Sequence, residues 1–118
     1  MTKRDLIEYC LALPSVYEDY PFSDDFGWTV MRHRQNKKGF AHIFEREGHA
    51  WINLKCEPMK ADFLRHVYLS VIPAYHMNKT HWNTIKLGGD VPQDELKRMI
   101  ERSYNLIKPK VKMRNEHI

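Results

Sequence analysis

The chain lacks the features that mark a membrane protein or a secreted protein. Among its 118 residues, no apolar run approaches the roughly 20 residues that a membrane-spanning helix requires. The N-terminus carries Lys3, Arg4 and Asp5 ahead of any long apolar segment, which is unlike a secretory signal. We therefore expect a cytoplasmic protein that does not associate with membranes.

Cysteine is scarce as well, and its two occurrences lie far apart. Cys10 and Cys56 both fall in segments with an apolar pattern. Buried cysteines of this kind usually stay reduced in cytosolic proteins. We interpret both as partly buried thiols, and we keep a disulfide or a nucleophilic pair of Cys56 with a histidine as less favoured alternatives.

The sequence also contains no motif that identifies an enzyme. His-Glu-x-x-His, Cys-x-x-Cys, Gly-x-Ser-x-Gly and phosphate-cradling glycine loops are all absent. Two of the seven histidines, His76 and His81, stand five residues apart, which is not a standard zinc spacing. Either imidazole could act as a general base, yet no partner nucleophile accompanies it. We predict no catalytic residue, no metal and no cofactor, and lean against an enzyme.

The formal net charge of +4 is unevenly distributed along the chain. Residues 1–27 carry a net charge of −4, whereas residues 28–88 carry +6 and residues 89–118 carry +2. A basic middle segment can attract an anionic partner, and it can equally be the solvated face of a sheet. Four acids near the N-terminus could bind a divalent cation: Glu18, Asp19, Asp24 and Asp25. They lack the spacing of a known cation-binding loop. We therefore favour acids that are solvated or that pair with the basic middle segment.

Apolar periodicity predicts a helix near each end of the chain. Thr2 can cap the first helix, and Pro14 ends it. Asp90 is the expected cap of the last helix, with Pro92 near its start and Pro109 at its end. The last helix has the clearest stripe of the sequence: Leu96, Met99, Ile100, Ser103, Tyr104 and Ile107.

Three strands are predicted between these helices, at residues 28–33, 40–45 and 50–55. Their connections are too short for a crossover, so the strands must pair antiparallel. Gly39 is available for a positive φ in the first turn. The acidic and aromatic residues 15–27 are expected to form a loop.

A short second helix is predicted at residues 57–66, followed by an extended segment at residues 67–72. Met59 and Phe63 are expected to face the core, together with His66. The whole pattern is typical of an α+β fold, an antiparallel β-sheet packed by N-terminal and C-terminal helices. We expect a single domain at residues 1–109, followed by a basic C-terminal tail at residues 110–118.

One stretch of the sequence fits neither a helix nor a strand. Residues 73–89 mix histidine, asparagine, lysine and aromatic residues between a proline and a double glycine. Only residues 82–87 alternate as a strand does, so residues 74–81 are predicted to form a structured loop, the focal loop. Lys79 is the member for which packing gives no obvious reason. The others can line a pocket, or act as a structural lock that holds backbone groups: Tyr75, His76, Asn78, His81 and Trp82.

This stretch resembles the signature of the MmcQ/YjbR family of small bacterial proteins, and the core of the similarity is Asn78-Lys79-x-His81-Trp82. The similarity extends over nearly the whole chain, including Leu13-Pro14, Leu54-Lys55-Cys56-Glu57-Pro58, Val91-Pro92-x-x-Glu95-Leu96 and Ser103-Tyr104. The resemblance implies a CyaY/frataxin-like arrangement, a "double-wing" shape, proposed DNA binding and no established catalysis. Members of the family usually have a shorter turn between the first strands than this chain has.

The first predicted turn is rich in basic residues, which favours an anionic partner. Our leading hypothesis is a monomer or weak dimer that binds DNA largely through phosphates, using Arg32, Arg34, Lys37, Lys38 and Lys79. An edge hairpin kept soluble by charge is the competing explanation of this turn. The alternative function is a non-catalytic module whose focal loop forms a pocket for an unknown anionic ligand or protein.

Overall fold

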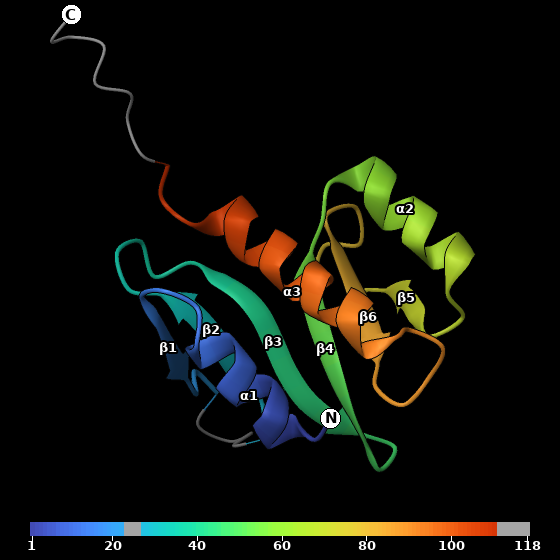
Figure 1. Ribbon diagram of the computed structural model, residues 1–118, viewed down its shortest axis with the longest axis horizontal. Coiled ribbons are helices and arrows are strands. Elements are labelled where there is room, and N and C mark those ends of the chain that lie inside the picture. Colours follow the sequence, from blue (N-terminus) through green and yellow to red (C-terminus); the bar gives the residue numbers. More distant parts are fainter. Residues whose placement is uncertain (23–26, 111–118) are drawn as a thin grey trace, which may run out of the picture.

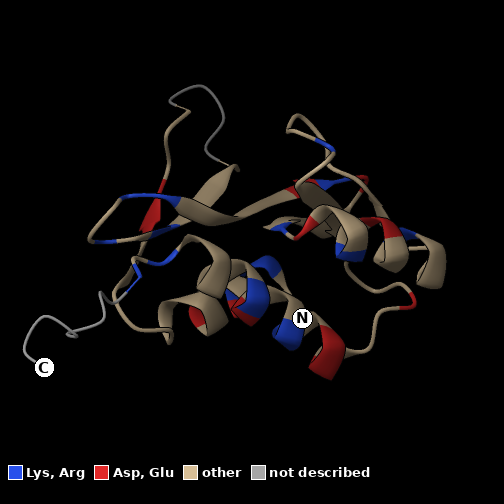
Figure 2. Ribbon diagram, turned by 90° about the horizontal axis from the view of Figure 1, so that it is seen from above, with Lys and Arg blue, Asp and Glu red and all other residues tan. Residues whose placement is uncertain are grey.

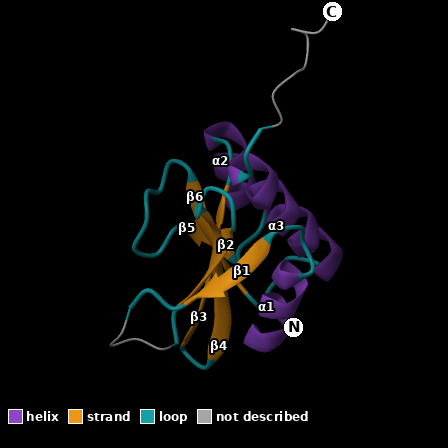
Figure 3. Cartoon of the chain, turned by 90° about the vertical axis from the view of Figure 1, so that its left-hand side faces the viewer, coloured by secondary structure: helices purple, strands orange, loops and turns teal. Residues whose placement is uncertain are grey.

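The computed structural model describes residues 1–22 and 27–110 of the chain. Its six strands form a single sheet in the order β1-β2-β3-β4-β6-β5, and every neighbouring pair is antiparallel. The three helices of the described residues lie on one side of this sheet, and none of them covers its other side (Figures 1 and 3). The elements are α1 (Lys3–Leu11), β1 (Val16–Asp19), β2 (Thr29–His33), β3 (Gly39–Arg46), β4 (His49–Lys55), α2 (Pro58–Val67), β5 (Val71–Pro73), β6 (Trp82–Lys86) and α3 (Gln93–Ile107). The prediction of an α+β fold with an antiparallel sheet is confirmed, and no helix in the described residues is long and apolar enough to cross a membrane.

The terminal helices form the main core with the sheet. Thr2 caps α1 as predicted, because its hydroxyl accepts from the Asp5 amide while the Asp5 carboxylate accepts from the Thr2 amide. The whole predicted stripe of α3 is buried. Within it, Ser103 accepts a hydrogen bond from the Lys55 amide at 2.8 Å and donates one to the Phe40 carbonyl at 2.6 Å. The polar member of the stripe thus satisfies backbone groups of β3 and β4 beneath the helix.

Both cysteines are free and buried, as expected from their apolar surroundings. Burial raises the pKa of the Cys10 thiol to about 12. Burial is also the main cause that raises the pKa of Cys56. Because the thiolate is the reactive form, neither side chain has the depressed pKa that a nucleophile needs.

The predicted loop at residues 15–27 is in part a strand. Val16–Asp19 forms β1, which pairs with β2 and becomes an edge of the sheet. The hairpin between β2 and β3 is therefore internal, and its interpretation as an edge hairpin is wrong. Of the four candidate acids, Asp24 and Asp25 lie outside the described residues.

The first turn differs from the prediction in one backbone detail. Lys37, rather than Gly39, takes the positive φ, at 61°. Glycine is needed at position 39 for space, because a Cβ there would lie 2.7 Å from a Val30 methyl. The side chain of Asn36 then fastens the turn to the end of α3 by donating to the Ile107 carbonyl at 2.8 Å.

Helix α2 is rotated relative to the prediction. Met59 is 88% exposed and Phe63 is 57% exposed, and His66 is exposed as well. Ala61 and Leu64 face the sheet instead. The small side chain of Ala61 allows close approach, and its carbonyl accepts a hydrogen bond from Asn83 of β6 at 3.1 Å.

Asp90 does not cap α3, contrary to the prediction. The N-cap of that helix is Pro92. The Asp90 carboxylate accepts instead from the amides of Leu69 and Ser70, at 2.7 and 2.9 Å, and from the Ser70 hydroxyl. These hydrogen bonds hold the pKa of Asp90 at about 2, and they tie the start of α3 to the start of β5.

Candidate functional site

The helix-free face of the sheet carries an unusual set of side chains. Strand alternation and cross-strand pairing place Val30, His42, Asn53 and Thr84 in one row across four strands. Aromatic and basic residues surround this row, and strand alternation places Asp19 on the same face. The other members are Tyr17, Arg32, Phe44, Arg46, Trp51, Lys55, Trp82 and Lys86.

The centre of the row fixes the focal loop to the sheet. Thr84 and Asn53 are both fully buried. The Thr84 hydroxyl accepts from the Tyr75 amide at 2.8 Å and donates to the Asn53 side-chain oxygen. The Asn53 amide group donates to the Tyr75 carbonyl at 2.9 Å. Both backbone groups of Tyr75 are therefore satisfied by side chains that the sequence analysis did not single out.

The remainder of the focal loop is held by its own side chains and by α2. The Asn78 oxygen accepts from the amides of Thr80 and His81, at 2.8 and 3.3 Å, which is the role expected of a structural lock. Arg65 of α2 donates to the Asn83 side chain at 2.6 Å and to the Lys79 carbonyl. Arg65 would have been difficult to find from sequence, because it looks like an exposed charge of a helix.

Lys79 has a packing role, contrary to the expectation that none exists. Its ammonium donates to the Ala74 carbonyl at 3.0 Å and so closes the focal loop. The residue is nevertheless exposed. His81 is exposed too, and its carbonyl accepts from the Cys56 amide at 2.8 Å.

A cavity of about 840 Å³ opens on this face beside the focal loop. Its aromatic floor consists of Trp28 and Phe44, whose rings stack with centroids 4.3 Å apart and an interplanar angle of 6°. Tyr75 stacks on Phe44 at 5.7 Å, and His76 packs on Tyr75 at 4.0 Å. The further lining residues are Phe22, Gly27, His42, Glu45, Arg46 and Met77.

The polar atoms of the floor bind each other. The indole nitrogen of Trp28 donates to Nδ1 of His42 at 3.0 Å. Burial, reinforced by the positive charge of Arg32, lowers the pKa of His42 to about 4, so its ring is neutral at pH 7. On its other side His42 meets the Trp82 ring edge to face at 5.6 Å. The floor therefore offers aromatic surface more than hydrogen-bonding groups.

The predicted hairpin bases lie at the end of the molecule where α3 ends (Figure 2). Arg34, Lys37 and Lys38 are exposed, and Arg34 lies over the Tyr17 ring at 5.7 Å. Arg32 is partly neutralised, since its Nε lies 2.8 Å from the Asp19 carboxylate. Within the described residues, this is the one carboxylate contact of the four bases.

The hairpin and the focal loop leave the same end of the sheet. The hairpin joins β2 to β3, the focal loop joins β5 to β6, and β4 lies between them. Lys55 is the last residue of β4 and pairs with Trp82. Basic residues thus follow one end of the sheet from the hairpin through Lys55 to Lys79, and the Asn36 contact adds Lys108, which follows α3.

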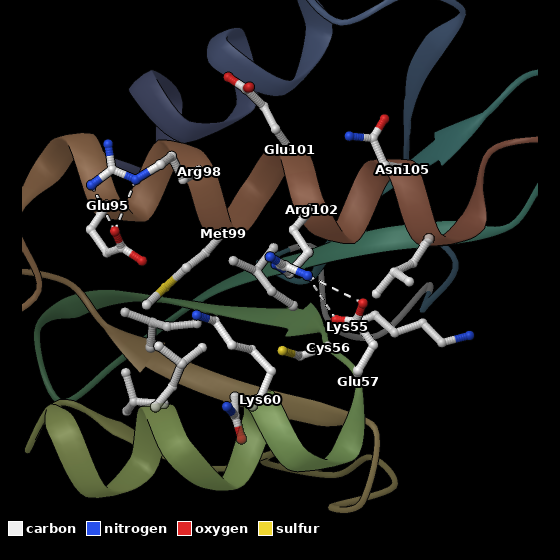
Figure 4. A pocket seen from close by; sticks show the side chains of 16 residues that line it. Lys55, Cys56, Glu57, Lys60, Glu95, Arg98, Met99, Glu101, Arg102 and Asn105 are labelled. Carbon is white, nitrogen blue, oxygen red and sulfur yellow. Dashed lines mark hydrogen bonds and ion pairs between the residues drawn. The ribbon is translucent and has the colours of Figure 1, made fainter.

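A second cavity, of about 560 Å³, lies between α2 and α3 on the opposite side of the sheet (Figure 4). Its charged side chains largely bind each other, because Arg102 pairs with Glu57 at 3.0 Å and Arg98 pairs with Glu95 at 2.7 Å. Among the described residues, no group of three or more histidine, cysteine or acidic side chains could hold a metal ion.

Comparison with known proteins shows one family. The YjbR family model matches residues 11–106. The uncharacterized protein YjbR of Escherichia coli is 32% identical over 108 residues, covering 88% of this chain and 85% of that protein. The uncharacterized protein YyaQ of Bacillus subtilis is 32% identical over 118 residues, covering 92% and 99%.

Solved structures share the fold. A crystal structure from Pseudomonas syringae has a TM-score of 0.83 at 29% identity and covers 92% of this chain and 100% of its own. One from Deinococcus radiodurans has a TM-score of 0.82 at 30% identity and covers 98% and 85%. The resemblance seen in the focal stretch is confirmed, and the chain belongs to the YjbR family.

Proposed function

We propose that this protein binds DNA through the hairpin end of its sheet, mainly by phosphate contacts and without reading sequence. The observation that carries the proposal is the exposure of Arg34, Lys37 and Lys38 on a hairpin that is fixed in place. Such bases contact phosphates without ordering a flexible segment first, and release of counterions supplies the free energy of binding.

The surroundings of the hairpin support the same function. Lys55 and Lys79 extend the positive charge along the end of the sheet, and Lys108 continues it beyond α3. Arg32 contributes less in this proposal, because Asp19 already neutralises part of its charge. A DNA-binding role is consistent with the cytoplasmic location expected from the sequence. The double-wing shape and the CyaY/frataxin-like arrangement remain predictions drawn from the resemblance.

A salt titration with a matched control tests this proposal. The test variant combines Arg34→Gln, Lys37→Asn and Lys38→Gln, where asparagine tolerates the positive φ of position 37. The control variant combines Lys60→Gln, Lys97→Gln and Arg98→Gln, which removes the same charge from the helices. Affinity for a 20-base-pair duplex is measured by fluorescence anisotropy between about 20 and 200 mM salt.

We expect the affinity of the wild type to fall steeply with salt concentration. Each phosphate contact contributes about 0.9 to the slope of log K against log salt, so the test variant should lose up to about 2.7 of that slope. The control variant should keep the wild-type slope. Absence of binding at low salt, a flat salt dependence, or equal losses in the two variants would refute DNA binding by the hairpin.

A further inference from the structure

The cavity on the helix-free face has no role in the proposed phosphate contacts. Its described lining includes Phe22 and Gly27 on one side and Tyr75, His76 and Met77 of the focal loop on the other. Its volume of about 840 Å³ falls within the range of small-molecule sites in proteins. Several aromatic rings contribute to its lining, and the lining side chains indicate what kind of ligand the cavity can bind.

The walls favour a flat, apolar ring system. Trp28 and Phe44 lie almost parallel and stack on each other, so a ligand ring can meet only their edges and outer faces. Two aromatic side chains stand at the mouth of the cavity, Phe22, which is 47% exposed, and His76, which is also exposed. Both lie near the Trp28 ring, with centroids 5.9 and 6.4 Å away. A ring placed among these groups would gain stacking and edge contacts, which tolerate any base because each base has an aromatic face.

One basic side chain reaches the same cavity. Arg46 donates to the Tyr75 hydroxyl at 2.8 Å, and its guanidinium lies over the Tyr75 ring at 4.5 Å. Within the described residues, Arg46 has no carboxylate within 4.0 Å. Its remaining N–H groups can therefore face an anion that is attached to the ring, such as a phosphate.

The cavity wall is held rigidly before any ligand arrives. Asn53 and Thr84 fix the backbone of Tyr75, as described above. The next residue, His76, has a φ of 63°, a conformation that is uncommon for a residue with a side chain. A small second core would not require this backbone conformation or an exposed phenylalanine. Rigid walls lower the entropy cost of binding, which suits a binding site.

We propose that this cavity binds one planar heteroaromatic ring that carries a phosphate, with the ring against Trp28, Phe22 and His76 and the phosphate on Arg46. The ring can belong to a free nucleotide or to an unpaired base of a DNA strand. The strand source rests on the proposed function, since the hairpin would then bind the neighbouring phosphates. The free-nucleotide source does not.

Two histidines of the focal loop allow a matched experiment. The test variant combines Phe22→Ala with His76→Asn, because asparagine tolerates the left-handed conformation. The control variant is His81→Asn, which changes an exposed histidine of the same loop that is not among the lining residues. The probes are adenosine monophosphate, a single-stranded decanucleotide and a duplex of the same sequence. Anisotropy gives the affinities, and NMR follows the indole N–H signal of Trp28.

We expect the single strand to shift the Trp28 signal, and the test variant to bind it about tenfold more weakly, as stacking energies imply. Duplex binding should change less than twofold, and the His81→Asn variant should behave as the wild type. A shift of the Trp28 signal by adenosine monophosphate as well supports a free nucleotide as ligand. A shift by the strand alone supports an unpaired base.

Two other outcomes separate this inference from the proposed function. If neither probe shifts the Trp28 signal, or if the test variant keeps full single-strand affinity, the cavity proposal is wrong even when hairpin-dependent duplex binding persists. If adenosine monophosphate shifts the signal while no DNA binds at any salt concentration, DNA binding is wrong and the cavity is a nucleotide site.

Discussion

Replacing Thr84 by valine tests how the sheet holds the focal loop. Valine has nearly the same shape as threonine, so the fully buried position keeps its packing. The substitution removes the hydroxyl that accepts from the Tyr75 amide at 2.8 Å and donates to the Asn53 oxygen. The buried Asn53 oxygen and the part-buried Tyr75 amide thereby each lose a partner.

The magnitude follows from those two groups. Each buried polar group left without a partner costs about 1–3 kcal/mol, and the part-buried Tyr75 amide belongs at the low end of this range, about 1 kcal/mol, so we expect Thr84→Val to destabilise the protein by about 2–4 kcal/mol. A chain of 118 residues has a free energy of unfolding of roughly 6–18 kcal/mol, so the variant should still fold. Its melting temperature should fall by roughly 8–16 °C.

Urea denaturation measures the loss, and amide hydrogen exchange locates it. In the variant, the Tyr75 amide should exchange much faster than in the wild type, because its acceptor is gone. Thr80→Val is the matched control, since Thr80 lies exposed in the same loop, and it should change the stability by less than about 0.5 kcal/mol. A loss below 0.5 kcal/mol for Thr84→Val, or an equal loss for Thr80→Val, would refute this account of the loop.

Two further predictions concern the stability of the protein in acid. Burial lowers the pKa of His42 in the folded protein to about 4. As the pH falls, the imidazole is therefore protonated in the unfolded state before it is protonated in the folded state. The free energy of unfolding should fall by about 3 kcal/mol between pH 6.5 and pH 4. A His42→Phe variant should lose this part of the pH dependence in urea denaturation, whereas His66→Phe, at an exposed site, should keep it; the same slope in both variants would contradict the assignment. The Asp90 carboxylate, with a pKa of about 2, stabilises the fold above pH 4 and loses this effect as the pH falls from about 4 to 2. Asp90→Asn should therefore lower the melting temperature at pH 7 and flatten the curve below pH 4, and Asp94→Asn, on the exposed first turn of α3, should do neither.

The elements that could be predicted from sequence are those whose pattern is local. Helix α3 is 15 residues long and lies between two prolines, and the period of its apolar stripe predicted both the helix and its buried face. The antiparallel order of β2, β3 and β4 followed from short turns. Strand β1 was missed because its four residues gain their pairing from β2, a contact that no local pattern encodes.

Helix α2 shows why its orientation could not be predicted. Met59 and Phe63 stand four residues apart and look like a core stripe, yet both are exposed. The real contact uses Ala61 and Leu64, because a small residue lets the helix approach β6 closely enough for Asn83 to reach the Ala61 carbonyl. Tertiary geometry overrode the hydrophobicity of single residues here.

The candidate site was predicted only in part, for a related reason. The hairpin bases and the focal loop were visible as unusual composition, and the structure connects them along one end of the sheet through Lys55. The cavity was not visible, because Phe22, Trp28 and Phe44 come from separate segments and each has an apolar pattern. The roles of Asn53 and Thr84 could not be predicted either, because the sequence does not show which group a polar side chain inside a strand will bind.

The distribution of buried residues indicates that the helix-free face does more than stabilise the fold. The main core, between the sheet and the helices, contains most of the buried apolar residues, whereas the opposite face buries only a small cluster of Trp28, Val30, Phe44 and Trp51 in the described part of the chain. An antiparallel sheet needs one covered face to be stable, and its second face can be left to water. Here that second face carries aromatic rings and a buried pair, Asn53 with Thr84, whose hydrogen bonds position one loop. These features do little for the main core, so we infer that they position the focal loop and the cavity for a ligand.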